Sequence, residues 1–503
     1  MAGNNRSYDG VSLSARLGEN IELIKKIFLR DSVLRVREIN CSRNMALFYF
    51  DGMVDAERIN DSIIKPLIER SGGEIFSADE RIAETLLRRV LYSNEAKTTA
   101  DLGEMLRAMM YGDTLLLIDG SAEGIICNTK GWSSRGISEP EDERILEGPR
   151  EGFSEAVMTN LSLLRRKLQT TDLCIEMLRV GRRTDTMVYI CYLGSLAPRR
   201  LVKELRRRIE KIDVDGILDT NYIAELCAGR SPSIFRRTGS TERPDIVASR
   251  LLEGRVAVLV DGSPMALTLP YLFSENFQSD EDYYQNFLTA SVGRVLRYLC
   301  FFLSISLPAI FVALSVFHRR LLPTSFLLSL TEARANAPFS SVTECFALIL
   351  IFEILKEAGV RTQQSLGSAL SIVGGLVVGQ AAVEARIVSA PMLIVVALSG
   401  IAGLMIPRLR AAVFYLRFGL VIASSLLGIY GFILGIFGML VLILSAESFG
   451  FDSTEALMGI RAQDYKDTVW RAPMSKMILR PRISDDRVRF RFKSGGKNEE
   501  NQK

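Results

Sequence analysis

The sequence has one histidine, His318, among its 503 residues. A histidine-rich metal site is therefore excluded, and a Ser-His-Asp or Cys-His catalytic arrangement could use only this residue. The seven cysteines are scattered and include no C-x-x-C pair, so they favour neither a zinc site nor a disulfide framework. The sequence also lacks the Walker A pattern of a phosphate-binding loop. We expect a protein that is not an enzyme and that holds no metal or other cofactor.

The sequence also lacks a large excess of either sign of charge. The 62 basic and 58 acidic residues leave a net charge of +4, which is no signature of nucleic-acid binding. The N-terminus is polar and has no apolar stretch of the kind found in a signal peptide, so we expect the first half to be cytoplasmic. A mean hydropathy of +0.17 is nevertheless high for a chain with 24% charged residues, because the average joins a polar half and an apolar half.

Up to about residue 285 the sequence predicts an α/β fold. Short apolar runs closed by Gly, Asp or Asn indicate buried strands, and apolar residues at three- and four-residue spacing indicate amphipathic helices. The predicted strands are Met45–Phe50, Thr114–Ile118, Leu173–Val180, Met187–Tyr192 and Arg255–Val260. The predicted helices are Ala56–Arg70, Ala78–Leu91, Gly152–Leu168, Pro198–Lys211 and Arg243–Leu252.

This half contains an internal repeat. The strand-turn-helix FYFDGMVDAERINDSIIKPLIE resembles ICYLGSLAPRRLVKELRRRIE, and the strand-turn LLLIDGSAEGII resembles AVLVDGSPMALT. Gly52 then corresponds to Gly194, and Asp119 to Asp261, with each pair 142 residues apart. Because the two separations agree, we predict two related α/β subdomains in tandem.

The repeat also sets the predicted domain boundaries. The helix NLSLLRRKL (160–168) resembles SVGRVLRYL (291–299), which places the end of the second copy at the start of the apolar half. The predicted domains are a polar segment (1–30), two related α/β subdomains (31–170 and 171–290), an all-α transmembrane bundle (291–448) and a basic tail (449–503).

The apolar half predicts a bundle of membrane-spanning helices. From Leu296 to Phe317 the only charge is Arg297, and these 22 residues are enough to cross a hydrocarbon core of ~30 Å. Basic residues beside the first span and in the tail predict that both ends are cytoplasmic, which leaves four or six crossings. The further candidate spans are Val342–Leu355, Leu366–Val388, Pro391–Ile406 and Ala411–Ala446, the last being long enough for a hairpin or a kinked helix.

Small and polar residues share one of these spans. Ser371, Gly375 and Gly379 recur at four-residue spacing and allow a close approach between helices. Gln380 and Glu384 follow each other at the same spacing on an adjacent face, where they could meet a neighbouring helix or a water-filled path. Two interpretations stay open: packing alone, or a conduction path formed by several subunits.

Charged residues near the membrane are candidates for coupling or interface contacts. Glu344 and Glu353 are nine residues apart, so they lie on opposite faces of a helix and cannot share one partner. The presence of Glu353 is explained either by a charged end of this helix on the cytoplasmic side or by a functional role. Arg294 precedes the first span, in the stretch 282–299 that would link the soluble half to the membrane.

The densest polar motif of the soluble half follows Thr241. Glu242, Arg243 and Asp245 precede or open a predicted helix, and Arg255 follows that helix at the start of a strand. Hydroxyl and acidic residues are typical of a helix start, so a purely structural role explains the motif. The alternative, a role in subunit contacts or in the response to a ligand, also stays open.

Together these motifs resemble a known family. The motifs follow one another as EGPREGF, NLSLLRRKL, GRRTDTMVYICYL, TERPDIVASRLLEGRVAVLVDGSP, EDYY and FEILKEAGVRTQQSLGSALSIVGGLVVGQAAVEARIVS, with a late SFG after them. This set of motifs, in this order, resembles the A subunits of GerA-type spore germinant receptors. The resemblance covers about residues 31–450. After SFG the chain departs from the family pattern, because the expected proline-rich continuation is lacking.

The resemblance implies a multi-pass protein of the inner spore membrane whose N-terminal domain lies in the spore core. It implies assembly with a transporter-like B subunit, the expected nutrient-binding partner, and with a lipoprotein C subunit. It further implies a homo-oligomeric ring in the lipid whose helices form an ion path that opens when nutrient binds. Two alternatives stay open: a solute transporter with a regulatory soluble half, and a scaffold that only holds the other subunits.

Overall fold

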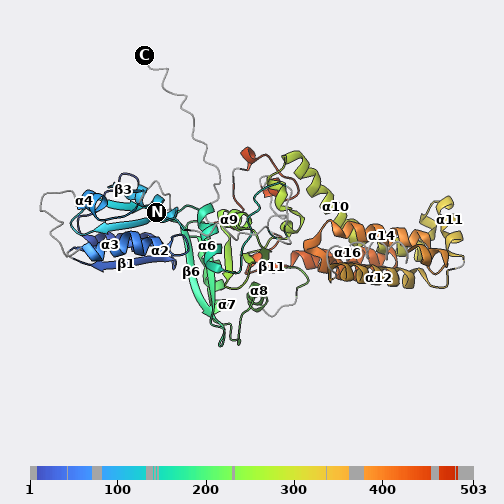
Figure 1. Ribbon diagram of the computed structural model, residues 1–503. Coiled ribbons are helices and arrows are strands. Elements are labelled where there is room, and N and C mark those ends of the chain that lie inside the picture. Colours follow the sequence, from blue (N-terminus) through green and yellow to red (C-terminus); the bar gives the residue numbers. More distant parts are fainter. Residues whose placement is uncertain are drawn as a thin grey trace, which may run out of the picture.

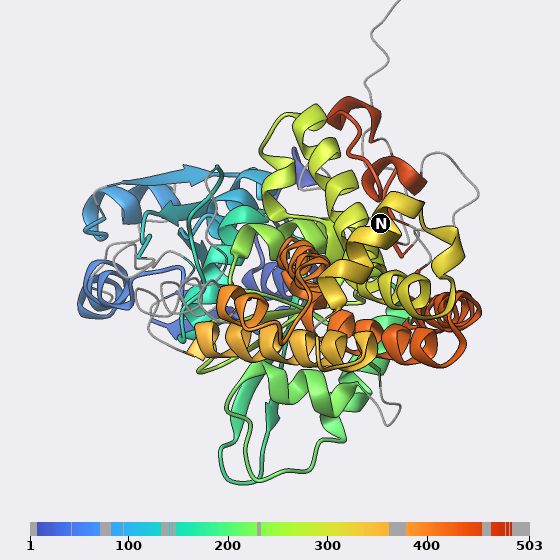
Figure 2. The ribbon, with the colours of Figure 1, turned by 90° about the vertical axis from the view of Figure 1, so that its right-hand side faces the viewer.

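Two α/β units and a bundle of helices follow one another along the molecule in the order of the sequence (Figure 1). Seen from the end of the bundle, most of the first unit lies to one side of the helices (Figure 2). The arrangement confirms the predicted fold class of two related α/β subdomains followed by an all-α region. The structure, a computed structural model, describes residues 8–484 except 42, 71–81, 94, 132–139, 141–142, 144–146, 229–232, 336, 362–378, 455–463, 478 and 482.

The first unit is an antiparallel sheet with helices on both faces. Its strands, in spatial order, are β1 (Leu34–Asn40), β2 (Asn44–Phe50), β4 (Thr114–Ile118), β5 (Gly124–Cys127) and β3 (Ala96–Thr99). Its helices are α1 (Leu17–Ile27), α2 (Ala56–Ile59), the π-helical turn η2 (Asn60–Ile64), α3 (Lys65–Arg70), α4 (Ile82–Arg89) and α5 (Leu102–Met110). Successive residues of β4 face opposite sides, so Leu115 packs with α1 and α5 while Leu116 packs with α2 to α4.

The second unit has the same architecture. Its strands, in spatial order, are β6 (Leu173–Val180), β7 (Thr186–Leu193), β9 (Val256–Val260), β10 (Ala266–Leu269) and β8 (Gly239–Thr241). Its helices are α6 (Val157–Lys167), α7 (Arg199–Glu210), α8 (Thr220–Cys227) and α9 (Pro244–Leu252). The strand order repeats that of the first sheet, and α6 and α9 pack on one face as α1 and α5 do in the first unit.

The repeat extends to individual hydrogen bonds. The amide of Asn20 bridges the backbone of Ser14 ahead of α1, and the amide of Asn160 bridges that of Ser154 ahead of α6 in the same way. The first backbone N–H of α1 donates to Asp119, as the first N–H of α6 donates to its repeat equivalent Asp261. The match between Asp119 and Asp261 is therefore confirmed at the level of side-chain contacts.

One predicted correspondence of the repeat is wrong. Residues 160–167 belong to α6, which takes the place of α1 at the beginning of the second copy, so the segment 160–168 does not correspond to residues 291–299 in α10. The predicted boundary after residue 170 separates α6 from the sheet that it covers, and the predicted boundary after residue 30 likewise separates α1 from the first sheet.

The helical region begins with α10 (Phe287–Val312) and the π-helical turn η5 (Ala313–Phe317). The helix that contains the expected first span, Leu296–Phe317, therefore begins nine residues before it, at Phe287. Among the described residues, Phe287–Phe317 and Pro407–Leu427 are long and apolar enough to cross a membrane, and Ala390–Leu404 and Ile429–Leu444 are apolar but shorter. The other helices are α11 (Thr324–Arg334), α12 (Ser341–Arg361), α14 (Ala390–Leu404), α15 (Arg410–Leu427) and α16 (Ile429–Leu444).

The last predicted span is a hairpin of α15 and α16. The chain turns at Gly428, whose φ of +62° is one that residues with a side chain rarely adopt. A Cβ atom on Gly431 would lie 1.9 Å from the carbonyl oxygen of Ala423, and one on Gly435 would lie 2.6 Å from Leu420. The glycines thus let the two helices pack closely against each other, and the alternative of one kinked helix is excluded.

Candidate functional site at the junction of the second subdomain and the helices

Charged side chains converge where the second sheet passes into α10. The link between β10 and α10 contains two short 3-10 helices, η3 (Phe273–Phe277) and η4 (Asp280–Tyr283). Most of this link is buried although it is rich in polar residues. Buried charges are stable only when they are paired, so each acidic group here requires a partner from another element.

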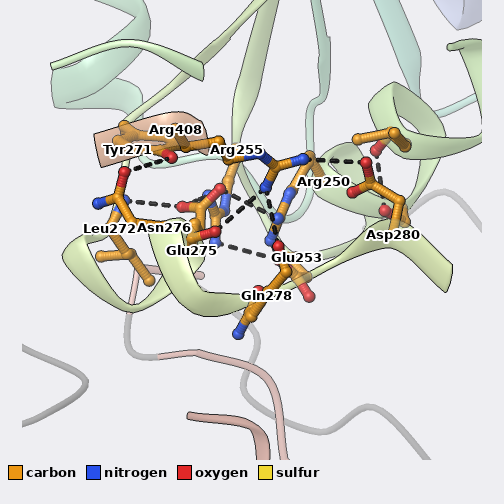
Figure 3. Close-up of polar contacts among 12 residues, drawn as sticks. Arg250, Glu253, Arg255, Tyr271, Leu272, Glu275, Asn276, Gln278, Asp280 and Arg408 are labelled. Carbon is orange, nitrogen blue, oxygen red and sulfur yellow. Dashed lines mark hydrogen bonds and ion pairs between the residues drawn. The ribbon is translucent and has the colours of Figure 1, made fainter. Parts of the chain in front are cut away.

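Glu275 is the centre of the first cluster (Figure 3). Its carboxylate accepts from Arg250 on α9, at 3.0 Å, and from Arg255 just before β9. Glu253 bonds to the same two arginines at 3.4 Å and 3.3 Å, which closes a ring of two acids and two bases. Burial acts to raise the pKa of Glu275, but the two arginines outweigh it and lower that pKa below its usual value. Glu275 therefore remains ionised inside the protein.

Arg408 joins this cluster to the helical bundle. It lies on the 3-10 turn η7 (Pro407–Leu409), between α14 and α15. One of its Nη atoms donates to the carbonyl oxygens of Glu275, at 3.1 Å, and of Gln278, at 3.2 Å. The other bonds to the carboxylate of Asp280 at 2.9 Å. A single guanidinium thus connects the base of the bundle to both 3-10 helices of the link.

A second cluster surrounds the first turns of α10. The fully buried guanidinium of Arg294 donates to Asp282 at 2.8 Å, and Arg297 on the next turn also bonds to Asp282, at 2.9 Å. Arg294 reaches past Asp282 to Asp467, whose carboxylate lies 2.9 Å away. The start of α10 is therefore held both by the link before it and by residues near the end of the chain.

We call residues 464–484 the C-terminal segment, all of which except 478 and 482 is described. This segment crosses the junction and returns to the second subdomain. The guanidinium of Arg471 donates to the carbonyl oxygen of Gln285 at 2.7 Å, and the backbone carbonyl oxygen of Arg471 accepts from the hydroxyl of Ser291 on α10 at 3.0 Å. Further on, Arg480 donates to the carbonyl oxygen of Leu252 at 2.8 Å, at the end of α9. The segment thus ties α10 to the subdomain that precedes it.

The residues predicted from the TERPD motif lie beside these clusters. Arg243 is fully buried, pairs with Asp245 at 2.6 Å, and donates to the carbonyl oxygen of Pro149. Tyr284, just before α10, donates its hydroxyl to Asp245. Glu242 is half-buried and joins through its backbone, because its carbonyl oxygen accepts from Phe153. Of the predicted coupling residues, 243, 245, 255 and 294 therefore lie at the junction, whereas residue 242 contacts the segment ahead of α6.

The two predicted glutamates of the bundle lie elsewhere and have separate partners. Glu344, at the start of α12, accepts from the backbone N–H and the hydroxyl of Ser389, at the start of α14. Glu353, near the other end of α12, pairs with Lys356 and lies 3.6 Å from Arg417 on α15. The geometry agrees with opposite helix faces, and it places neither residue at the junction.

The small-residue stripe is described only in part. Ser371 and Gly375 lie outside the described residues. Gly379 faces Leu393 on α14, because a Cβ atom there would lie 3.5 Å from that side chain. Gln380 donates to Glu384 at 3.0 Å, and both side chains are exposed.

Sequence reasoning missed Arg417, a further buried charge of the bundle. Its guanidinium donates to the carbonyl oxygen of Ser304 on α10 at 2.8 Å, to the Ser304 hydroxyl at 2.7 Å, and to the carbonyl oxygen of Ser399 on α14 at 3.2 Å. Arg417 therefore links α15 to α10 and α14, and its ion pair with Glu353 also reaches α12. Its signal in the sequence is clear, because it is the only charge in the apolar run of residues 411–446.

These features define a class of protein in which two repeated α/β units are joined to apolar helices through a buried ionic junction. The family described as Bacillus/Clostridium GerA spore germination protein matches residues 22–483. The chain belongs to this family.

Individual relatives agree with this assignment. The chain is 38% identical to spore germination protein KA of Bacillus subtilis, over 95% of this chain and 89% of that protein. It is 32% identical to spore germination protein GerLA of Bacillus cereus, over 92% of this chain and 95% of that protein. Among solved structures, the chain matches the crystal structure of the N-terminal domain of the A subunit of the Bacillus megaterium spore germinant receptor GerK3. The two sequences are 31% identical, the match covers 52% of this chain and 97% of that domain, and the TM-score is 0.42.

Proposed function

We propose that this protein is the membrane subunit of a nutrient germinant receptor that helps to trigger spore germination. In this proposal it forms a homo-oligomer whose helices make a nutrient-gated ion path, together with a transporter-like B subunit and a lipoprotein C subunit. Family membership and the names of the relatives support the role in germination. The buried junction is the observation that carries the gating proposal, because it offers a continuous mechanical connection between the soluble units and the helices.

The positions of the helix ends support a multi-pass arrangement in the inner spore membrane. One end of the bundle meets the soluble units at Arg408, and Glu357 on α12 lies at this near end because it pairs with Arg410 at 3.0 Å. The far end is marked by Gly428, which approaches His318 after α10. Glu344 and Ser389, which contact each other, lie away from the near end.

Five of the described helices run between these ends. The helices α10 and α15 leave the near end, whereas α12, α14 and α16 return to it. The C-terminal segment is again beside the second subdomain. Of the expected counts of four and six, we propose six, with the N-terminal domain and the C-terminal segment both in the cytoplasm, which is the spore core.

The junction gives the proposed mechanism its coupling step. Nutrient binding on a partner subunit biases a closed-to-open equilibrium only if the nutrient binds one state more tightly than the other. Arg408 and Arg294 fix the near ends of α15 and α10 to the buried link, so a shift of the link would change the tilt of both helices. Arg417 then connects α15 with α10 and α14 inside the bundle.

Reconstitution tests this proposal. The purified chain is placed in liposomes loaded with a potassium-sensitive dye, alone and with its B and C partners, and ion flux is measured with and without nutrient. We expect nutrient-dependent flux from the complex, which changes when Gly375 or Gln380 is replaced by leucine. Stoichiometric uptake of the nutrient would instead identify a transporter, and the absence of both flux and uptake from an assembled complex would leave only a scaffold.

A further inference from the structure

The start of α10 exposes a stripe of apolar side chains. Leu288, Val292 and Val295 follow one another at spacings of four and three residues, which places them on one face of the helix. Each of the three is more than half exposed. The charged residue among them, Arg294, is fully buried and pairs with Asp282, so it does not interrupt the stripe. We call these three apolar side chains the α10 stripe.

The α10 stripe lies outside the part of the helix that lipid would cover. Ser304 on α10 bonds to Arg417, which is seven residues beyond Arg410 on α15. Since α10 and α15 both leave the near end, α10 reaches the level of Arg410 about seven residues before Ser304, near Arg297. The stripe precedes this level. A contiguous apolar surface that faces water marks a contact site for another surface.

A second stripe lies on α8. Leu218, just before the helix, and Tyr222 and Leu226 within it are four residues apart, and they are 66%, 46% and 45% exposed. The opposite face of α8 packs with the second sheet through Ile223 and Cys227, which are buried. The helix thus has two apolar faces, of which the fold covers one. We call Leu218, Tyr222 and Leu226 the α8 stripe.

The helix α8 runs toward the base of the bundle. At its start, Asp219 accepts from Ser263, in the turn between β9 and β10. At its end, the carbonyl oxygen of Cys227 accepts from Arg208, whose guanidinium lies 4.7 Å from the centre of the Phe449 ring, five residues after α16. The stripes of α8 and α10 therefore both adjoin the base of the bundle. They span eight and seven residues, or about 12 Å and about 11 Å.

The two stripes lie on opposite sides of the junction and beside charges of opposite sign. In Figure 1 α8 lies below the junction and the start of α10 above it, and Figure 2 agrees. Glu225, next to Leu226, is exposed and is the charged residue of α8. Lys466 and Lys476 belong to the C-terminal segment, which contacts α10 through Arg471. The edges of the two stripes are therefore complementary in charge.

We propose that the α8 stripe of one copy of this chain packs against the α10 stripe of the next copy. One such contact covers both stripes, which match in length, and the charges at its edges orient the partners while adding little to their stability. Because all copies lie in one membrane, they are related by rotation about the membrane normal. Contacts between two different faces of the chain then repeat around this axis and close into a ring.

This inference rests on the homo-oligomer of the proposed function and names the surfaces that build it. The contact would also connect neighbouring copies at the coupling junction. The start of α10 is fixed to the link through Arg294 and Asp282. A movement of the second subdomain in one copy would therefore reach α10 of the next copy through α8, which favours opening of all copies together.

Cross-linking in native membranes tests the contact. The full-length chain carries both Leu226→Cys and Val292→Cys, its native cysteines are kept, and the wild type gives the background. After oxidation we expect a ladder of covalent oligomers, because each copy supplies both sides of the contact. A mixture of the two single variants should stop at dimers. Leu226→Cys combined with Leu29→Cys, whose position on the first unit is 77% exposed, is the control and should remain at background.

A charge pair placed in the contact tests it without cross-linking. Leu226→Glu and Val292→Lys should each weaken assembly in detergent about tenfold, because an unpaired charge enters an apolar contact. The double variant should return to within about threefold of the wild type, because the two charges then meet across the contact. Light scattering measures the assembly, and circular dichroism verifies that each variant is folded. Both positions are exposed in the single chain, so neither substitution disturbs its core.

Several results would overturn the proposal. These are cross-linking of residues 226 and 292 no stronger than in the control, a double variant no better assembled than the single ones, and cross-linking of Val292→Cys to a B subunit instead of a second copy. Quenching of a fluorescent label at residue 292 by brominated lipid would assign the stripe to the membrane instead. An oligomer that cross-links but conducts no ions would refute the channel and leave this contact standing, whereas ion flux without the cross-link would do the reverse.

Discussion

Arg294 and Asp467, which are 173 residues apart in the chain, form an ion pair of 2.9 Å at the start of α10. The pair joins the helix that enters the bundle to the segment that leaves it. Arg294 also bonds to Asp282 in the link. The entry of the chain into the helical region and its exit are therefore held at one point, and this point adjoins the second subdomain.

Replacing Asp467 tests whether the C-terminal segment holds α10. Asp467→Ala removes the carboxylate but keeps the backbone carbonyl oxygen of residue 467, to which Arg294 also donates. We expect a loss of about 1.5–3 kcal/mol, the usual contribution of a hydrogen bond to a charged group. Limited proteolysis of the purified chain should cut the C-terminal segment faster in this variant. Asp452→Ala, at an exposed position, is the matched control. Equal cleavage rates in the two variants would contradict the role assigned to the ion pair.

The Glu275 cluster predicts a dependence of stability on pH. The pKa of Glu275 is below its usual value of 4.5 in the folded chain, so its contribution is complete above about pH 4.5 and is lost as the pH falls through the lower, folded value. Glu275→Gln should cost about 3–5 kcal/mol at pH 7, because it leaves Arg250 and Arg255 buried with one acid between them.

The measurement is thermal unfolding of the full chain in detergent between pH 7 and pH 3. The stability difference between the wild type and Glu275→Gln should shrink as the pH falls below 4.5. Glu225→Gln, on the exposed side of α8, serves as the control and should follow the wild type throughout. A difference that is constant across the whole range would show that the carboxylate charge of Glu275 does not stabilise the junction.

Arg417 predicts a difference between two conservative substitutions. Two nitrogens of Arg417 make these bonds, Nε to the carbonyl oxygen of Ser304 and Nη2 to the Ser304 hydroxyl and the carbonyl oxygen of Ser399. The single ammonium of Arg417→Lys cannot take both positions, so we expect a loss of about 1–3 kcal/mol in the unfolding of the helical region. Arg410→Lys, at the start of the same helix, alters an exposed ion pair and should cost less than about 1 kcal/mol. Thermal unfolding in detergent compares the two, and similar losses would refute the linking role of Arg417.

The α15–α16 hairpin predicts opposite effects at two glycines of one helix. A Cβ atom on Gly431 would overlap the backbone of Ala423, whereas a Cβ atom on Gly438 would meet nothing within 4 Å. Gly438→Ala should therefore stabilise the helix by about 0.5–1 kcal/mol, and Gly431→Ala should separate α16 from α15 and destabilise the bundle. The same unfolding assay measures both, and tolerance of alanine at residue 431 would argue against the close packing of the two helices.

Hydrophobic patterns predicted part of the fold. The strands β2, β4, β6, β7 and β9 were predicted because each contains a short, mainly apolar run. Strands such as β3, AKTT, and β8, GST, are short and polar, and no pattern distinguishes them from loops. They form strands because a neighbouring strand offers hydrogen bonds in the right register, which is information from outside the segment.

The candidate site was predictable only in part. Arg243, Asp245 and Arg294 were found because they lie in a dense polar motif or just before an apolar run. Glu275 and Arg408 gave no such signal, since one is an acid in a polar link and the other is one of several basic residues beside the helices. Their pairing joins residues more than a hundred positions apart, and local spacing does not encode such contacts.

The sequence by itself determined the repeat, the division into a polar and an apolar half, and the family. These properties depend on periodicity and on short-range motifs, which are preserved in the order of the residues. Only the tertiary structure decided that α6 opens the second copy, that Gly428 turns a hairpin, and that the C-terminal segment closes over α10. Each of these depends on which surfaces meet in space. A buried charge is stable only when its partner is in place, and close packing at a glycine likewise requires the facing helix.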